Sequence, residues 1–131
     1  MPEETRSRVL LVDDDPVILR LLEVNFRLDG FDTQTATRGE DALSRAVDWI
    51  PDMIVLDVMM PGLDGWEVAR RLREHEQLAS VPVVFLSARA QEDDRMRGYA
   101  LGVVEYVTKP FDPSTLVEIV RRHLRGGEPQ P

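Results

Sequence analysis

Cysteine is absent from this chain of 131 residues, and lysine occurs once, at Lys109. The absence of cysteine excludes disulfide bonds, thiolate zinc sites and cysteine nucleophiles. The longest apolar runs have about five residues, far fewer than the ~20 that a membrane-spanning helix needs. Residues 1–8 are polar and lack the apolar core of a targeting sequence. These absences predict a cytoplasmic protein without a membrane-spanning segment.

Positive charge is also scarce. The chain has 16 Lys and Arg residues against 24 Asp and Glu residues, which gives a formal net charge of −8 and a pI near 4.7. Nucleic acids and anionic membranes attract basic surfaces, so we expect this chain to bind neither of them directly. Its length is sufficient for one hydrophobic core, and its content of 43% hydrophobic residues is ordinary for a globular domain.

Four short apolar runs predict buried strands. They are almost continuously apolar rather than alternating, as expected of strands covered on both faces in a parallel sheet. A fifth, more polar run suits a strand at the edge of the sheet. The buried runs are residues 9–12, 53–56, 83–86 and 103–107, and the edge run is residues 31–36.

Helical patterns alternate with these strands, at about residues 17–28, 43–50, 66–77, 92–101 and 113–124. Strict alternation favours a parallel sheet with helices on both faces. Because crossovers are right-handed, five such units predict a doubly wound, flavodoxin-like α/β fold with strand order 2-1-3-4-5 and five helices on two faces. In the first helix, one face carries Val17, Leu21, Val24 and Leu28.

Polar residues indicate how the helices begin. Asp15, next to Pro16, and Asp64 are expected to cap the first and third helices. Thr37 and Glu40 have the spacing of a capping box for the second helix. The remaining helical charges are interpreted as solvated surface, among them Arg70, Arg71, Arg73, Asp93 and Asp94.

Charged side chains follow the predicted strands where they end. Asp13 and Asp14 follow the first strand, Asp57 follows the third, and Lys109 follows the fifth. In a doubly wound sheet the carboxyl ends of all strands lie along one edge, and ligands bind there at the switch point between strands 1 and 3. We therefore expect these four side chains to converge on one site.

Three carboxylates in one site repel one another. Two unit charges ~4 Å apart interact by roughly 4 kcal/mol at an effective dielectric constant of about 20. A hard divalent cation with oxygen ligands relieves this repulsion, and Mg²⁺ suits a site that also holds phosphate. The charges of three aspartates, one Mg²⁺ and the Lys109 ammonium sum to zero. The prediction is one Mg²⁺ bound by Asp13, Asp14 and Asp57, with Mn²⁺ as a substitute.

A phosphoryl group on Asp57 would add about one negative charge and three acceptor oxygens to this site. The hydroxyl of Ser87, which follows the fourth strand, is placed to donate to such a group. Movement of Ser87 toward it would open space into which Tyr106 of the fifth strand could rotate. Phosphorylation is thus predicted to change the charge of the site and, through it, to shift a nearby surface from one of its two arrangements to the other.

At these residues the chain resembles the receiver domain of two-component response regulators. The resemblance covers residues 8–124 and rests on Val-Leu-Leu-Val-Asp-Asp-Asp at 9–15, Asp-Val-Met-Met-Pro-Gly-Leu-Asp-Gly at 57–65, Leu-Ser-Ala at 86–88 and Tyr-Val-Thr-Lys-Pro-Phe at 106–111. It implies Mg²⁺-dependent phosphorylation by a sensor histidine kinase or a phosphotransfer protein. It also implies signalling to an output protein or domain, which the sequence does not identify.

The resemblance assigns roles to single positions. Asp57 matches the phosphoacceptor, Asp14 the direct metal ligand and Asp13 the ligand that acts through water. Met59 matches the residue whose backbone carbonyl completes the metal shell. Lys109 matches the lysine that contacts the phosphate and precedes a cis proline bond. Because Met59 has no amide to position an attacking water, we expect slow autodephosphorylation.

Ser87 and Tyr106 match the switch pair of the family, which acts on the surface formed by the fourth helix, the fifth strand and the fifth helix. Arg89 matches a position that tunes dephosphorylation. One subfamily of DNA-binding regulators uses acidic residues of that surface in a dimer, and this chain has Val104 and Ala100 at two such positions. We therefore expect a monomer or a weak, phosphorylation-dependent dimer. Residues 1–125 are expected to form the domain, and residues 126–131 a flexible tail or truncated linker.

The main interpretation is a non-enzymatic signalling domain that promotes its own phosphorylation and dephosphorylation. Two alternatives stay open beside it. Aspartate-nucleophile phosphatases also place a carboxylate after a strand, with magnesium and a lysine. They commonly carry a second acid two residues after the nucleophile, where this chain has Met59. Phosphorylation-independent interaction domains often lose an acidic residue or the lysine, and here all of them are present.

Overall fold

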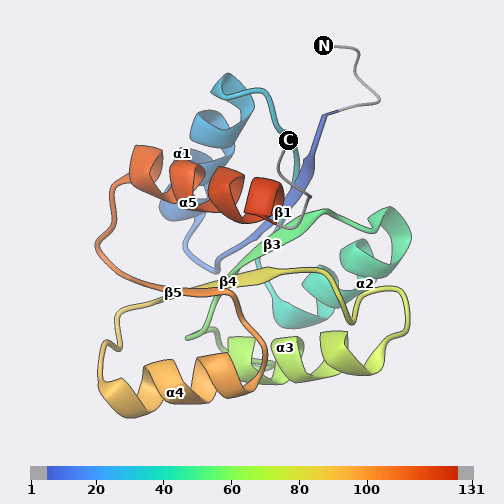
Figure 1. Ribbon diagram of the computed structural model, residues 1–131, viewed down its shortest axis with the longest axis vertical. Helices are drawn as coiled ribbons and strands as arrows, with labels where there is room; N and C mark the ends of the chain where they lie inside the picture. The colour runs from blue at the N-terminus through green and yellow to red at the C-terminus, as the bar shows by residue number, and fades with distance from the viewer. Residues whose placement is uncertain (1–5, 127–131) are drawn as a thin grey trace.

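Five strands and five helices alternate along residues 6–126, the part of the chain that the computed structural model describes (Figure 1). The strands are β1 (Arg8–Val12), β2 (Asp32–Ala36), β3 (Met53–Asp57), β4 (Val83–Ser87) and β5 (Glu105–Thr108). The helices are α1 (Pro16–Leu28), α2 (Gly39–Trp49), α3 (Gly65–Glu74), α4 (Glu92–Ala100) and α5 (Pro113–Gly126). Residues 127–131 of the predicted tail lie outside the described residues.

The strands form one parallel sheet in the order β2-β1-β3-β4-β5, which confirms the predicted topology. The polar strand β2 lies at an edge, as its composition predicts, and every residue of β3 and β4 is buried. In this register Asp57 is paired with Leu86, and Ser87 with Thr108. The carboxyl ends of β1, β3, β4 and β5 therefore meet at one edge of the sheet.

Helices cover both faces of the sheet. In Figure 1, α1 and α5 lie on one face, and α2, α3 and α4 lie on the other. Alternate residues of the strands supply the two cores: Val9 and Leu11 pack with α1 and α5, whereas Leu10 and Val12 pack with α2 and α3. No helix among residues 6–126 has both the length and the apolar character that crossing a bilayer requires.

The helix starts follow the sequence only in part. Asp15 accepts a hydrogen bond from the Val17 N–H at 2.9 Å, so its predicted capping role is confirmed. The capping box predicted for α2 is wrong, because α2 begins at Gly39 and no side chain caps it. A Cβ on Gly39 would lie 2.5 Å from the carbonyl oxygen of Leu63. The first residue of α2 therefore has no room for a side chain.

Helix α1 carries two apolar stripes. The stripe identified from the sequence, which we call the α1 outer stripe, is between 40% and 83% exposed and consists of Val17, Leu21, Val24 and Leu28. Contact with the sheet is made instead by Leu19, Leu22 and Phe26. The α1 outer stripe therefore lies on the solvent side of the helix and contributes little to the core.

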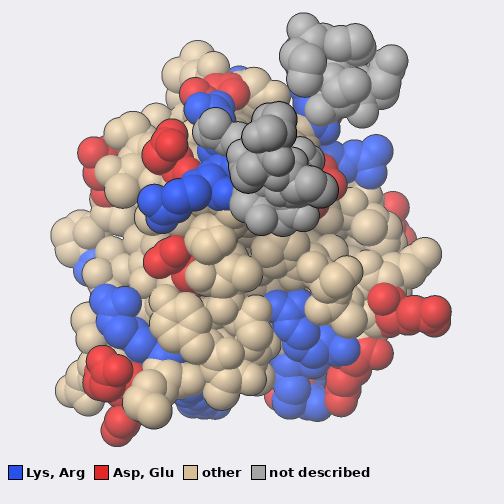
Figure 2. Space-filling model, in the orientation of Figure 1, with Lys and Arg blue, Asp and Glu red and all other residues tan. Residues whose placement is uncertain are grey.

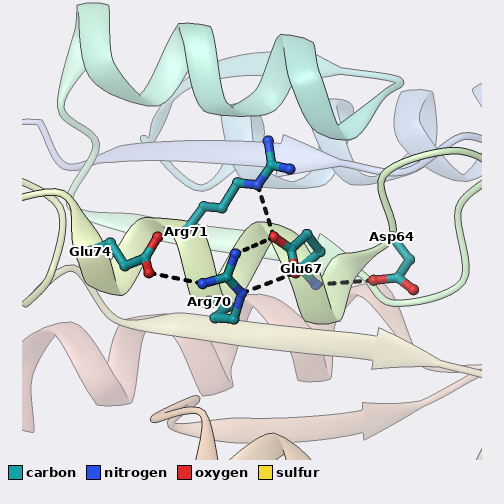
Figure 3. Close-up of polar contacts among 5 residues, drawn as sticks. All are labelled: Asp64, Glu67, Arg70, Arg71 and Glu74. Carbon is teal, nitrogen blue, oxygen red and sulfur yellow. Dashed lines mark hydrogen bonds and ion pairs between the residues drawn. The ribbon is translucent and has the colours of Figure 1, made fainter.

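The outer face of α3 is charged and internally paired (Figure 3). The Asp64 carboxylate caps the helix by accepting a hydrogen bond from the Glu67 N–H at 3.0 Å, as predicted. Glu67 accepts hydrogen bonds from Arg70 and Arg71, which lower its pKa to about 2, and Arg70 also reaches Glu74 at 2.8 Å. Arg70 and Arg71 thus form the solvated surface that the sequence indicates.

Arg73 differs from its two neighbours on α3 and is not a solvated surface residue. Its guanidinium is half-buried and donates hydrogen bonds to four backbone carbonyls, those of Ala79, Val81, Leu101 and Gly102. Burial lowers the pKa of this guanidinium. Arg73 therefore fastens the loop before β4 and the loop after α4 to the end of α3.

Candidate functional site

Three carboxylates gather at the carboxyl edge of the sheet. Asp13 and Asp14 follow β1, and Asp57 ends the neighbouring strand β3. One carboxylate oxygen from each of the three residues lies within 4.8 Å of the others. Asp13 and Asp57 are buried, with 0% and 2% of their surface exposed, whereas Asp14 faces solvent. The predicted convergence of these side chains is thus observed.

Lys109 completes this group, which we call the acidic site. Its Nζ lies 3.0 Å from Asp13 Oδ2 and 3.4 Å from Asp57 Oδ1. Burial lowers the pKa of Lys109, but the adjacent carboxylates of Asp13 and Asp57 outweigh burial and raise it. Lys109 is therefore a permanent cation in the acidic site. The Lys109–Pro110 peptide bond is cis, as expected.

The surroundings of the Asp57 carboxyl disfavour its charged form. Burial and the charge of Asp13 raise its pKa from 3.8 to about 7, although Lys109 acts in the opposite direction. One ammonium group thus fails to balance three carboxylates that lie so close together. The acidic site consequently favours a further cation.

The donor atoms of the acidic site fit Mg²⁺. Oxygen is the only donor element of the three carboxylates, and Mg²⁺ prefers such ligands. The buried Oδ2 of Asp13 lies 3.0 Å from Lys109 Nζ and has no other partner among the described residues. The other oxygen of Asp13 is fixed by the Asp15 N–H at 2.9 Å. Asp13 is therefore held in place with lone pairs directed into the site.

Met59 follows Asp57 by two residues and contacts it through the backbone. The Met59 N–H donates to Asp57 Oδ1 at 3.3 Å, and the Met59 side chain is half-exposed. The predicted role of its carbonyl oxygen as a metal ligand stays a prediction.

Gly65, the first residue of α3, packs closely against the backbone of Asp57 and Val58. Its N–H donates to the Val58 carbonyl at 2.8 Å. A Cβ at this position would lie 2.6 Å from both the Asp57 carbonyl oxygen and the Val58 Cα, which are backbone atoms that cannot yield. Sequence reasoning assigned no role to Gly65, although a glycine directly after the N-cap Asp64 is a signal for such a close approach.

Ser87 and Tyr106 lie beside the acidic site on β4 and β5. Ser87 is buried, and its Oγ accepts a hydrogen bond from the Arg89 N–H at 3.0 Å. Tyr106 points inward: its ring lies 6.2 Å from that of Phe85, and its hydroxyl donates to the Arg89 carbonyl at 2.9 Å. Both residues thus contact the same loop residue. The predicted rotation of Tyr106 stays a prediction.

Comparison with known proteins agrees with this geometry. The chain is 42% identical to the DNA-binding dual master transcriptional regulator RpaA of Synechocystis over 118 residues, which are 90% of this chain and 49% of that protein. It is 40% identical to the DNA-binding response regulator MtrA of Mycolicibacterium smegmatis over 126 residues, 96% of this chain and 54% of that protein. The chain therefore spans about half the length of the curated relatives that it matches.

Solved structures show the same fold over nearly their whole length. The chemotaxis protein CheY4 of Vibrio cholerae has a TM-score of 0.86 and 30% identity, with 90% of this chain and 98% of that chain covered. The receiver domain of Francisella response regulator 1452 has a TM-score of 0.87 and 33% identity, with 94% and 100% covered. The profile of the response regulator receiver domain matches residues 9–121. This chain therefore belongs to the receiver domain family of two-component response regulators.

Proposed function

We propose that the chain is a Mg²⁺-dependent switch that accepts a phosphoryl group on Asp57 from a histidine kinase or a phosphotransfer protein. The observation that carries this proposal is the buried Asp57 carboxylate, which lies beside Asp13 and Asp14 and 3.4 Å from Lys109 Nζ. In the transfer, an Asp57 oxygen bonds to phosphorus while the phosphorus–nitrogen bond of the donor histidine breaks. The imidazole leaves with the electron pair and takes up a proton.

Each residue of the acidic site has a part in this transfer. Asp13, Asp14 and Asp57 would hold Mg²⁺, and the Met59 carbonyl would complete the shell. A bound Mg²⁺ supplies positive charge for the oxygens of the transferred group. Lys109 adds a fixed cation next to Asp57, so that the incoming negative charge meets two positive partners.

The switch would act through Ser87 and Tyr106 on the surface formed by α4, β5 and α5. The Ser87 oxygen now accepts from the Arg89 N–H, and phosphorylation would offer the Ser87 hydroxyl proton a charged acceptor that draws the side chain away from Arg89. The Tyr106 hydroxyl is hydrogen-bonded to the Arg89 carbonyl. Movement of this loop would therefore disturb the hydrogen bond that holds Tyr106 in place. Two hydrogen bonds to Arg89 therefore couple the acidic site to that surface.

The phosphodonor would dock on the α1 outer stripe. Its exposed apolar residues begin at Val17, four positions after Asp13, so the stripe starts at the rim of the acidic site. A donor that presents an apolar helical face could bind there and bring its phosphohistidine to Asp57.

Output is proposed to reside in a separate domain or protein. Some relatives that are about twice as long as this chain are named as DNA-binding regulators. This chain carries a net charge of −8, and on the face shown in Figure 2 its basic side chains alternate with acidic ones. Such a surface does not favour direct contact with DNA.

Intact-mass measurement with acetyl phosphate tests the proposal. We expect one added phosphoryl group in the presence of Mg²⁺ or Mn²⁺, and none with EDTA or in Asp57→Asn. No added group in the wild-type chain would refute phosphorylation and favour an interaction domain. Repeated turnover of a phosphomonoester such as p-nitrophenyl phosphate would favour the phosphatase alternative.

A further inference from the structure

The loop between β4 and α4 connects the acidic site to α4 through one residue, Arg89. Its N–H donates to Ser87 Oγ at 3.0 Å, and its carbonyl accepts from the Tyr106 hydroxyl at 2.9 Å. Its guanidinium Nη2 lies 3.1 Å from Asp94 Oδ1 in the first turn of α4. Arg89 thus contacts both residues of the proposed switch and, separately, the helix that the switch acts on.

Asp94 is not the solvated carboxylate that the sequence indicates. It is 7% exposed, whereas its neighbour Asp93 in the same turn faces solvent. The start of α4 favours a negative charge, but a buried carboxylate still needs a partner of opposite charge. Arg89 supplies that partner, while the adjacent Arg95 donates to the Tyr106 carbonyl at 3.2 Å.

A phosphoryl group on Asp57 would compete for the same guanidinium. With Mg²⁺ bound, the three carboxylates, the metal and Lys109 sum to zero charge, and phosphorylation adds about one negative charge. Leu86 pairs with Asp57 in the sheet, so Arg89 starts only three residues from the level of the phosphoacceptor. Its side chain is more than half exposed and can change direction without disturbing the core.

We propose that Asp94 is a positioning residue that keeps the Arg89 guanidinium on α4 and thereby limits how long a phosphoryl group persists on Asp57. This inference rests on the proposed function of Asp57. When Asp94 holds Arg89, only Mg²⁺ and Lys109 shield the phosphoryl group. When Asp94 is neutralised, Arg89 is released to cover the group and to hinder the attack of water.

The test measures the lifetime of the phosphoryl group by intact mass after acetyl phosphate is removed. Asp94→Asn is expected to lengthen the half-life about fivefold, the effect of a single partly exposed ion pair. Asp93→Asn removes the same charge from the same turn without touching Arg89, so it should leave the half-life unchanged. A half-life of Asp94→Asn equal to or shorter than that of the wild type would overturn the proposal.

A double variant separates positioning from a general effect on α4. In the Arg89→Ala background, Asp94→Asn should no longer change the half-life, because the guanidinium that it releases is gone. A persistent effect there would show that Asp94 acts through the helix start instead. Hydrogen exchange of the unphosphorylated chain gives an independent reading: Asp94→Asn, but not Asp93→Asn, should speed exchange of the Arg89 amide.

The exchange measurement also distinguishes the two proposals. A wild-type chain that takes up no phosphoryl group would refute the function proposed for Asp57. The positioning role would then be decided by exchange alone, and unchanged protection of the Arg89 amide in Asp94→Asn would refute it.

Discussion

The ends of β3 and β4 lie side by side at the acidic site, but they are held in different ways. The end of β3 is enclosed by backbone: the Val58 N–H donates to Leu86, the Val58 carbonyl accepts from Gly65, and Asp57 is buried. The backbone of β4 is also bonded, since the Lys109 N–H donates to the Ser87 carbonyl, but the loop that follows β4 is held by side-chain hydroxyls: Ser87 and Tyr106 each make one hydrogen bond to Arg89. The end of β3 carries the proposed chemistry, and the loop after β4, which depends on two hydroxyl groups, carries the proposed signal.

The largest expected effect comes from adding a methyl group at Gly65, which packs against the end of β3. Gly65→Ala should destabilise the chain by about 3 kcal/mol, because its Cβ would overlap the backbone at Asp57 and Val58. Urea unfolding measures this loss. Gly62→Ala is the control: Gly62 has a φ of +74° but nothing within 4 Å of its Cβ, so only backbone strain of about 1 kcal/mol is expected. Equal losses of stability in Gly65→Ala and Gly62→Ala would show that the end of β3 is not tightly packed against Gly65.

A smaller effect of opposite sign is expected from Asp57→Asn without divalent cations. Because the pKa of Asp57 is raised to about 7 in the folded chain, the folded state binds this proton more tightly than the unfolded state. The contribution of Asp57 to stability should therefore fall as the pH rises from about 4 through 7. At pH 8 the variant should be more stable by on the order of 2 kcal/mol, and the gap should shrink toward pH 5.

Urea unfolding in EDTA at pH 5 and pH 8 checks this sign. Exposed Asp48 provides the control, since Asp48→Asn should change stability little at either pH. Mg²⁺ should stabilise the wild-type chain at pH 8 and do so less at pH 6, where a proton competes with the metal for Asp57. A wild-type chain that is more stable than Asp57→Asn at pH 8 in EDTA would show that burial does not strain this carboxyl.

Tyr106→Phe probes the β4 end and should cost about 1 kcal/mol. The variant removes the hydroxyl that donates to Arg89 but keeps the ring, which packs against Phe85 and Trp66. Urea unfolding gives the cost, and intact mass should show that phosphorylation of Asp57 persists. A loss of phosphorylation would show that Tyr106 takes part in the chemistry at Asp57. The proposed division of roles between the two strand ends would then be wrong.

The smallest effect on the fold is expected at the α1 outer stripe. Leu28 is 83% exposed, so Leu28→Ser should change stability by less than about 0.5 kcal/mol. It should slow phosphoryl transfer from a phosphohistidine protein but leave phosphorylation by acetyl phosphate unchanged. Met96→Ser on α4, also an exposed apolar position, should slow neither reaction. Equal rates for all three proteins would remove α1 from the docking surface.

The topology and the members of the acidic site could be predicted from the sequence because each follows from a local pattern. Continuous apolar runs identify β1, β3 and β4, and the parallel arrangement brings residues that follow them, such as Asp13 and Asp57, to one edge. That convergence depends on topology alone, so it needs no knowledge of how single side chains pack.

Features that depend on packing between elements were missed. On α1, the stripe of Val17 and the stripe of Leu19 are both apolar, and only contact with the sheet decides which is buried. Asp94 and Arg73 look like ordinary helical charges, yet their partners lie in loops outside their own helices. Their spacing in the sequence carries no signal of these contacts.

Two of the four hydrogen bonds from Arg73 have a mechanical consequence for α4. They hold the residues directly after this helix, Leu101 and Gly102, to the end of α3. A rod fixed at one end pivots instead of sliding, and its displacement increases with distance from the fulcrum. Along the nine residues of α4, a lever arm of about 13 Å, any swing is therefore greatest at the end next to Arg89 and Asp94.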